Sequence, residues 1–217
     1  MNKNVKKADL PFSKTGVIPL FYHDDLEVCK RLIRACYEGG IKEIEFTNRG
    51  SNAHEVFKEL LSWSATAYPD LVLGIGTIKT VEDAQRFIAI GARFIVTPIL
   101  DTNVGQVCKE HNIPWIPGCF TLSEMYTAYQ NGATLVKVFP VDSLGGSKFI
   151  KSVLSPCPEL KLMPSGGIKA DKEDVKAYLN AGVHCVGIGS SLFKRNKAGE
   201  FNYQAISETC KEILNVL

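Results

Sequence analysis

A lysine stands in the middle of an apolar segment, where a charged side chain is costly to bury. Lys137 follows Leu135 and Val136 and precedes Val138 and Phe139, a run typical of an interior β-strand. An ammonium group removed from water without a partner tends to lose its proton. A neutral lysine amine can attack a carbonyl carbon and form a Schiff base, so Lys137 is a candidate nucleophile. The alternative is an edge-strand lysine whose charged head reaches water.

A second buried charge is expected at Glu45, which lies between Ile44 and Phe46 in another strand-like run. A buried carboxylate needs a partner, and Lys137 could be that partner. Glu45 could instead carry the protons that Schiff-base chemistry moves at each addition and elimination step. A purely structural ion pair is the alternative to both roles. Glu43 would face the same way but nearer the start of the strand, and is the weaker candidate.

Other groups suited to binding anions follow strand-like runs. Arg49 offers a planar guanidinium for a carboxylate, and Thr77 offers a hydroxyl that could share this task. Two glycine-rich turns, 164–168 and 187–192, offer backbone N–H groups to a phosphate, and the start of a short helix would add its dipole. The residues assigned to phosphate are Ser165, Gly166, Gly167, Gly189 and Ser190. An ordinary surface arginine and glycines that only make tight turns are the alternatives.

The elements that must position these groups alternate along the chain. Eight short apolar runs are typical of β-strands, at 16–20, 43–46, 71–74, 94–97, 115–117, 135–140, 161–164 and 185–188. Amphipathic segments between them predict helices, among them 26–37, 53–63, 81–90, 123–129 and 171–179. Start signals at Thr80 and Asp171 and glycine stop signals at 39–40, 132 and 182 support these helices.

This alternation implies parallel strands joined by right-handed crossovers, and eight such units close into a barrel. We therefore predict an α/β fold, a single (β/α)8 TIM barrel domain comprising residues 1–217. An open doubly wound sheet is the alternative, but no G-x-G-x-x-G follows the first run. In a barrel the candidate groups would meet at the carboxyl ends of the strands, where Pro98 and Phe139 are expected to line the pocket.

Composition narrows the classes of function. The net charge of +2 on 217 residues gives no indication of a nucleic-acid partner, so a small molecule is the expected substrate. The seven cysteines are scattered without a C-x-x-C pair, and the four histidines lack metal-ligand spacing. We predict reduced cysteines that serve packing, and no metal. The basic segment 1–7 precedes no apolar stretch and no run could span a bilayer, which predicts a cytoplasmic protein without a membrane partner.

Several stretches together resemble one known family, the class I aldolases acting on 2-keto-3-deoxy-6-phosphogluconate (KDPG) and 4-hydroxy-2-oxoglutarate (KHG). The similarity runs nearly from end to end of the chain. The stretches are GVIP at 16–19, IEFTNR at 44–49, GT at 76–77, IPGCFTLSE at 116–124, VKVFP at 136–140 and PSGGI at 164–168.

The resemblance implies a role for each candidate residue. The lysine matching Lys137 would form the Schiff base with the 2-keto carbon, and the glutamate matching Glu45 would move protons. Arg49 and Thr77 would hold the pyruvate carboxylate, and the turns at Ser165–Gly167 and Gly189–Ser190 would hold the distal phosphate. The family needs no cofactor and is typically trimeric, so the resemblance implies a homotrimer acting on a phosphorylated keto acid.

The predicted activity is cleavage of KDPG, and of KHG, to pyruvate and an aldehyde. One alternative is a sugar-phosphate isomerase or epimerase on the same barrel, in which Glu45 would abstract a proton without a covalent step. Another is a non-catalytic sugar-phosphate-binding protein, against which the presence of both Lys137 and Glu45 argues. Reduction with borohydride in the presence of pyruvate distinguishes the aldolase, because only a Schiff base would leave a stable adduct.

Overall fold

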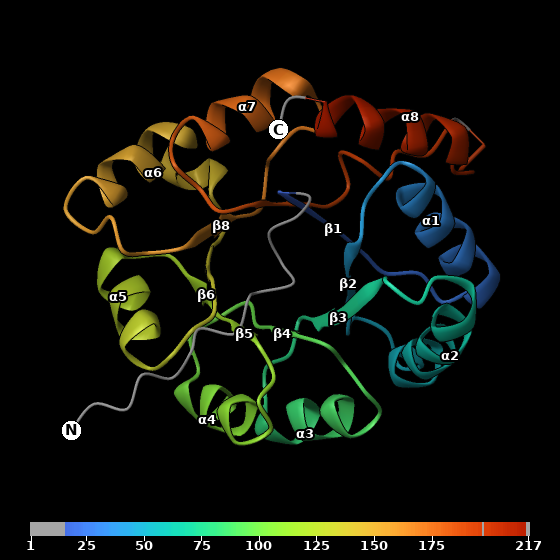
Figure 1. The fold of residues 1–217 in the computed structure, drawn as a ribbon, viewed down its shortest axis with the longest axis horizontal. Helices are drawn as coiled ribbons and strands as arrows, with labels where there is room; N and C mark the ends of the chain where they lie inside the picture. Colours follow the sequence, from blue (N-terminus) through green and yellow to red (C-terminus); the bar gives the residue numbers. More distant parts are fainter. Residues whose placement is uncertain (1–15, 197, 216–217) are drawn as a thin grey trace.

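The computed structural model describes residues 16–196 and 198–215, so the basic segment 1–7 lies outside the described residues. Short strands lie at the centre, and helices surround them (Figure 1). The strands are β1 (Val17–Phe21), β2 (Glu43–Thr47), β3 (Val72–Gly76), β4 (Ile95–Val96), β5 (Trp115–Ile116), β6 (Gly118–Cys119), β7 (Val136–Val138), β8 (Leu162–Pro164) and β9 (Val186–Ile188). The helices are α1 (Leu26–Glu38), α2 (Ala53–Ala67), α3 (Val81–Ala89), α4 (Thr102–Glu110), α5 (Leu122–Gln130), α6 (Ser147–Leu154), α7 (Lys172–Leu179), α8 (Tyr203–Leu214) and the short 3₁₀ helix η2 (Asp142–Leu144).

All strand pairs are parallel, as the alternation of strand and helix predicts. One sheet has the order β5-β4-β3-β2-β1-β9 and the other the order β6-β7-β8. Backbone contacts join the two sheets at both ends: the N–H of Thr134, just before β7, donates to the carbonyl of Trp115 in β5 at 2.8 Å, and Ser165 forms a parallel bridge with Gly187 of β9. The predicted α/β architecture, with parallel strands inside a ring of helices, is confirmed.

The fifth predicted strand, 115–117, differs from expectation because proline divides it. Pro117 has no backbone N–H to donate to a neighbouring strand. Before it, β5 pairs with β4; after it, β6 pairs with β7. The eight expected strands are therefore nine segments within the described residues.

Local signals define the helix ends as predicted. The Thr80 side chain accepts a hydrogen bond from the N–H of Asp83 at 3.1 Å, and Asp171 does the same for Asp174 at 2.8 Å. Positive φ angles turn the chain back after three helices, at the predicted glycines Gly40, Gly132 and Gly182. These caps fix where each helix begins and returns toward the next strand.

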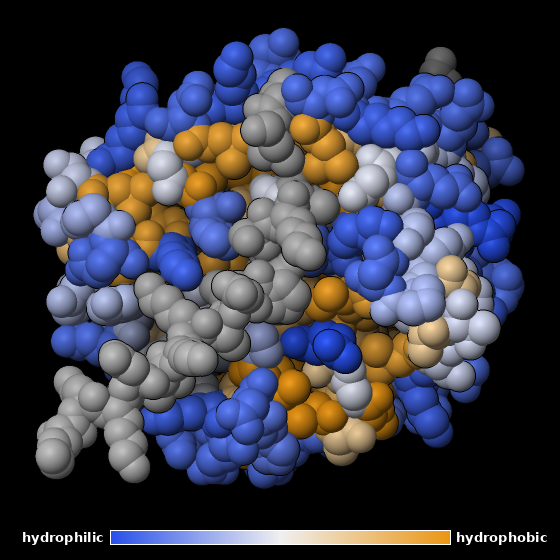
Figure 2. Space-filling model, viewed as in Figure 1, coloured by the Kyte–Doolittle hydropathy of each residue, from blue (hydrophilic) through white to orange (hydrophobic). Residues whose placement is uncertain are grey.

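The interior of the barrel divides into an apolar part and a polar part. The apolar plug, as we call it, consists of fully or almost fully buried side chains: Ile18, Phe94, Val96, Ile116, Leu135, Met163 and Cys185. A larger core lies between the strands and the helices and includes Ile44 and Phe46 of β2. Because side chains alternate along a strand, Glu45 faces the other way, into the barrel. Hydrophilic residues cover the outer helices on the face seen in Figure 2.

Candidate active site

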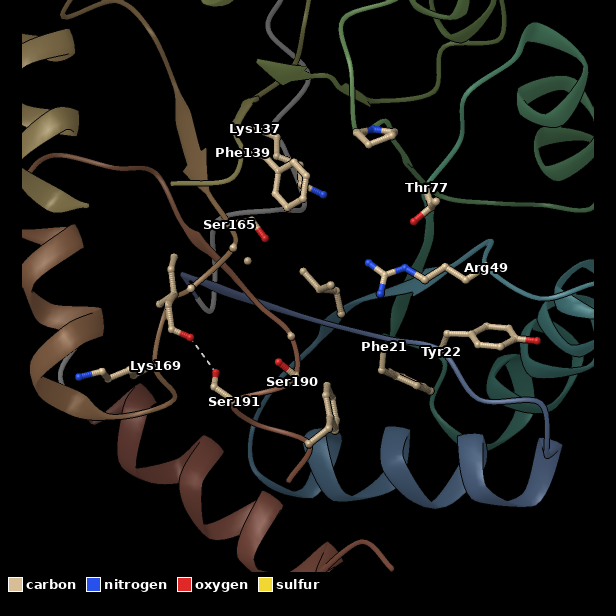
Figure 3. Close-up of a pocket in the computed structure, with 18 of the residues that line it drawn as sticks. Phe21, Tyr22, Arg49, Thr77, Lys137, Phe139, Ser165, Lys169, Ser190 and Ser191 are labelled. Carbon is tan, nitrogen blue, oxygen red and sulfur yellow. Dashed lines mark hydrogen bonds between the residues drawn. The ribbon is translucent and has the colours of Figure 1, made fainter. Parts of the chain in front are cut away.

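A cavity of about 600 Å³ contains nearly all of the residues predicted from the sequence. Its lining includes Arg49, Thr77, Pro98, Lys137, Phe139, Ser165, Gly166, Gly167, Gly189 and Ser190. Figure 3 shows the polar ends of Lys137, Thr77, Arg49 and Ser165 directed toward one shared space. Strands distant in sequence thus bring these groups together, as the barrel prediction requires.

Lys137 lies in the middle of β7 and reaches the cavity from the barrel wall. Its side chain is buried, with only 6% of the residue exposed, and its Nζ atom lies 5.0 Å from the centre of the Phe139 ring. The edge-strand alternative therefore does not apply. Among the described residues, the ion pairs with N···O distances up to 4.0 Å include neither Lys137 nor Glu45. The structure thus gives no support to a purely structural ion pair between them.

Glu45 is buried beside the cavity and is not one of its lining residues. Burial raises the pKa of its carboxyl group above the usual value, while the positive charges of Lys137 and Arg49 act in the opposite direction. Its Oε2 atom has no hydrogen-bond partner among the described residues. A buried, unpaired carboxylate oxygen within electrostatic reach of a lysine is suited to exchanging protons with a bound molecule.

The space for the Glu45 carboxyl group exists because β3 carries a glycine, Gly76, beside that group. A Cβ atom at Gly76 would lie 1.7 Å from Oε1 of Glu45, so any side chain there would force the Glu45 carboxyl group to move. Two residues earlier in β3, the ring of Phe94 occupies the equivalent space beside Gly74. Glu43, the weaker candidate, is buried at the start of β2. Burial in the apolar plug, and to a lesser degree the negative charge of Glu43, raise the pKa of Cys185. Glu43 does not line the cavity.

The candidate carboxylate site is formed where β2 and β3 end. Thr77 has a φ of 61°, an uncommon conformation for a β-branched residue. The loop that carries Arg49 is attached to β3, because the N–H of Asn48 donates to the carbonyl of Gly76 at 2.8 Å. Figure 3 shows the Thr77 hydroxyl and the Arg49 guanidinium facing the same space. Such strained residues are often found at functional sites.

The candidate phosphate site is formed by the turns after β8 and β9. Gly166 and Gly167 have φ angles of 87° and 84°, which favour glycine, and a Cβ atom at Gly167 would lie 2.4 Å from Asp142. The two turns are joined by the Ser191 hydroxyl, which donates to the carbonyl of Ile168 at 2.7 Å (Figure 3). The position and conformation of these turns agree with the sequence prediction.

One detail of that prediction is wrong, because no short helix begins at either turn in the described residues. After β9 the chain makes a single turn, in which the N–H of Leu192 donates to the carbonyl of Gly189 at 3.0 Å. After β8 the next helix is α7, and its N-cap residue Asp171 already accepts a hydrogen bond from the N–H of Asp174 in the first turn. Any anion held here would therefore receive backbone N–H groups and hydroxyls without a helix dipole.

The cavity is strongly basic. Among the described residues its lining includes four basic side chains and no acidic one, the basic residues being Arg49, Lys137, Lys169 and Arg195. Sequence reasoning missed Lys169 and Arg195, and it also missed Tyr22, Ser191 and Phe201. The basic pair Lys194–Arg195 directly after the eighth turn was the available signal. Only the folded structure shows that Arg195 lines the cavity.

Other chemistry finds little support in the described part of the chain. No group of three or more His, Cys, Asp or Glu side chains there could hold a metal ion. All seven cysteines are free and six are buried, and burial raises the pKa of the Cys119 thiol to about 12. None of the helices in these ranges has the length and apolar character needed to cross a membrane.

Together the fold and the cavity define a class: a (β/α) barrel enzyme for an anionic small molecule, with a buried lysine and a buried carboxyl group at the carboxyl ends of its strands. Comparison with known proteins identifies the family. The chain belongs to the KDPG and KHG aldolases, because the family model matches residues 9–209. It is an aldolase, and hence a lyase, as the resemblance predicted.

Individual relatives agree over almost their whole lengths. The 2-dehydro-3-deoxy-phosphogluconate aldolase of Treponema pallidum is 36% identical over 205 residues, which are 94% of this chain and 96% of that protein. The KHG/KDPG aldolase of Escherichia coli K12 is 28% identical over 212 residues, 97% of this chain and 96% of its own. Among solved structures, the KDPG aldolase of Legionella pneumophila is similar with a TM-score of 0.82 and 29% identity, covering 94% of this chain and 96% of that one.

Proposed function

We propose that this protein cleaves KDPG to pyruvate and glyceraldehyde 3-phosphate, and also cleaves KHG, through a Schiff base on Lys137. The observation that carries this proposal is the Lys137 amine, buried in a basic cavity within electrostatic reach of the buried Glu45 carboxyl group. Support also comes from the Legionella relative, in which pyruvate was captured as a covalent carbinolamine. A carbinolamine is the first intermediate of the same route.

The reaction would begin with addition of the Lys137 amine to the C2 carbonyl. The carbinolamine loses water with help from Glu45 and becomes a protonated imine. Glu45, directly or through water, removes the proton of the C4 hydroxyl, and the electrons of the C3–C4 bond move into the imine as the aldehyde departs. The remaining enamine is protonated at C3, and addition of one water releases pyruvate and the free amine. One water leaves and one enters, so no cofactor is required.

The rest of the cavity would hold the two charged ends of the substrate. Arg49 and Thr77 are suited to the carboxylate because a guanidinium binds it with two hydrogen bonds and a hydroxyl can add a third. The distal phosphate would lie on Ser165, Gly166, Gly167, Gly189 and Ser190. Pro98 and Phe139 would form the apolar wall between these ends.

The experiment that tests this function is intact-mass spectrometry after incubation with pyruvate and borohydride. We expect one reduced pyruvate imine per chain, located on the peptide containing Lys137, and no adduct or turnover for Lys137→Ala. The matched control is Lys169→Ala, because Lys169 also lines the cavity but its ammonium points away from Lys137 (Figure 3). An adduct that persists in Lys137→Ala would contradict the mechanism. An isomerase or a binding protein would give no adduct at all.

We also propose that residues 1–217 form one domain and act as a homotrimer in the cytoplasm. The match of the family model to residues 9–209 supports one domain, and seven free cysteines are typical of a reducing compartment. The trimer is supported by the apolar patch, our name for the exposed large hydrophobic residues within the described ranges: Ile99, Phe120, Leu122, Tyr126 and Tyr129. Four of them lie on α5 or directly before it. Ile99 lies in the loop after β4, whose Pro98 backbone packs against Gly118 shortly before α5, as expected for a surface that contacts another copy.

A further inference from the structure

We propose that Arg195 binds the distal phosphate of the substrate and determines the preference for phosphorylated over unphosphorylated sugar acids. This inference rests on the proposed function, since it concerns the substrate of that same cavity. The residue lies beyond the glycine turn that follows β9, and its side chain lines the cavity together with Gly166, Ser190 and Ser191.

The argument starts from the charge that the phosphate site must balance. A phosphate monoester carries a charge of about −1.5 to −2 at neutral pH. The turns after β8 and β9 offer neutral N–H groups and hydroxyls, and neither turn begins a helix whose dipole would add positive charge. The compensating charge must therefore come from side chains.

Three basic side chains follow these turns, and only one is suitably placed. Lys169 follows the turn after β8, but Figure 3 shows its ammonium directed away from the Ser165 and Ser190 hydroxyls. Lys194 is exposed and does not line the cavity. Lys137 and Arg49 belong to the opposite, keto-acid end of the proposed substrate. Arg195 is thus the cation that the structure offers to the phosphate.

The guanidinium of Arg195 is held in place although the residue is exposed. It lies over the ring of Phe201 with its Cζ atom 4.2 Å from the ring centre, and its Nη1 atom donates to the carbonyl of Gly199 at 2.7 Å. The backbone of Arg195 also bridges that of Phe201. Both contacts restrict the side chain, and they use one face and one N–H of a group with five donors. The remaining edge is suited to bidentate binding of phosphate.

The test compares KDPG with 2-keto-3-deoxygluconate, which lacks only the phosphate. For Arg195→Met we expect kcat/KM for KDPG to fall on the order of 10- to 100-fold, because a charge-assisted contact is lost. For the unphosphorylated acid, and for the rate of pyruvate adduct formation with borohydride, we expect no change. Arg195→Lys should recover part of the loss, and the matched control Lys194→Met should behave like the natural protein.

Three outcomes would overturn the proposal. One is a kcat/KM for KDPG within about twofold of the natural value in Arg195→Met. Another is an equal loss for both substrates and for adduct formation, which would indicate a structural role. The third is equal affinity of the natural protein and Arg195→Met for inorganic phosphate in calorimetry. If the proposed function itself were wrong, the natural protein would form no pyruvate adduct. The titration with inorganic phosphate would still test Arg195 in that case.

Discussion

At the residue scale, the buried carboxyl group of Glu45 links stability to pH. Burial raises its pKa in the folded protein above the ordinary 4.5, so the folded chain keeps a proton that the unfolded chain has released. The stabilisation that comes from the protonated carboxyl group is therefore fully present below the pKa of the unfolded chain. It is lost as pH rises through the raised pKa of the folded chain.

Glu45→Gln removes this titration and tests both roles of the residue. We expect the free energy of unfolding of the variant, relative to the natural protein, to increase as pH rises from about 4 to about 8. Turnover of KDPG should fall on the order of 100- to 10,000-fold, because the amide cannot accept the C4 hydroxyl proton. Urea unfolding at several pH values and steady-state kinetics measure the two effects. A stability difference independent of pH would show that Glu45 does not titrate as the structure indicates.

The burial of single residues was largely predictable from the sequence, and their surroundings were not. An apolar run around Lys137 and another around Glu45 predicted burial, and both residues are buried. Their separation by more than ion-pair distance, and the position of Glu45 beside the cavity, depend on the curvature of the barrel. Arg195 could not be chosen among many exposed basic residues, because its position depends on packing against Phe201.

At the scale of the elements, two glycines of β3 have different tasks that a matched pair of variants can separate. A Cβ atom at Gly76 would displace the Glu45 carboxyl group, whereas one at Gly74 would meet the Phe94 ring at 2.3 Å. We expect Gly76→Ala to reduce kcat at least about tenfold. Gly74→Ala should instead lower the free energy of unfolding by about 1–3 kcal/mol while the folded fraction remains active.

Thermal or urea unfolding together with kcat per folded molecule distinguishes these effects. If both variants lost activity equally, the division of β3 into a catalytic and a packing position would be incorrect.

The order of strands and helices was predictable from the spacing of apolar residues and from capping signals such as Thr80. The division of the fifth strand at Pro117 was less evident, because a proline at a strand end and one inside a strand look alike in sequence.

At the scale of the whole molecule, the apolar patch predicts assembly. Tyr126 lies on α5, and its ring is 5.9 Å from that of Tyr129. Tyr126→Glu would place an unpaired charge in the proposed contact between copies, so we expect a monomer in size-exclusion chromatography with light scattering. Lys58→Glu, on the exposed side of α2, is the control and should stay trimeric. A monomeric natural protein at micromolar concentration would contradict the assembly.

The apolar plug beneath Lys137 limits the routes by which water enters the site and products leave it. Its side chains, from Ile18 to Cys185, are at most 1% exposed, so neither solvent nor product can pass through that end of the barrel. The water that hydrolyses the imine must then arrive by the route along which the aldehyde departs. We expect the departing aldehyde to shield the enamine until it has left, which makes pyruvate the last product released and favours carbon–carbon bond synthesis whenever the aldehyde is abundant.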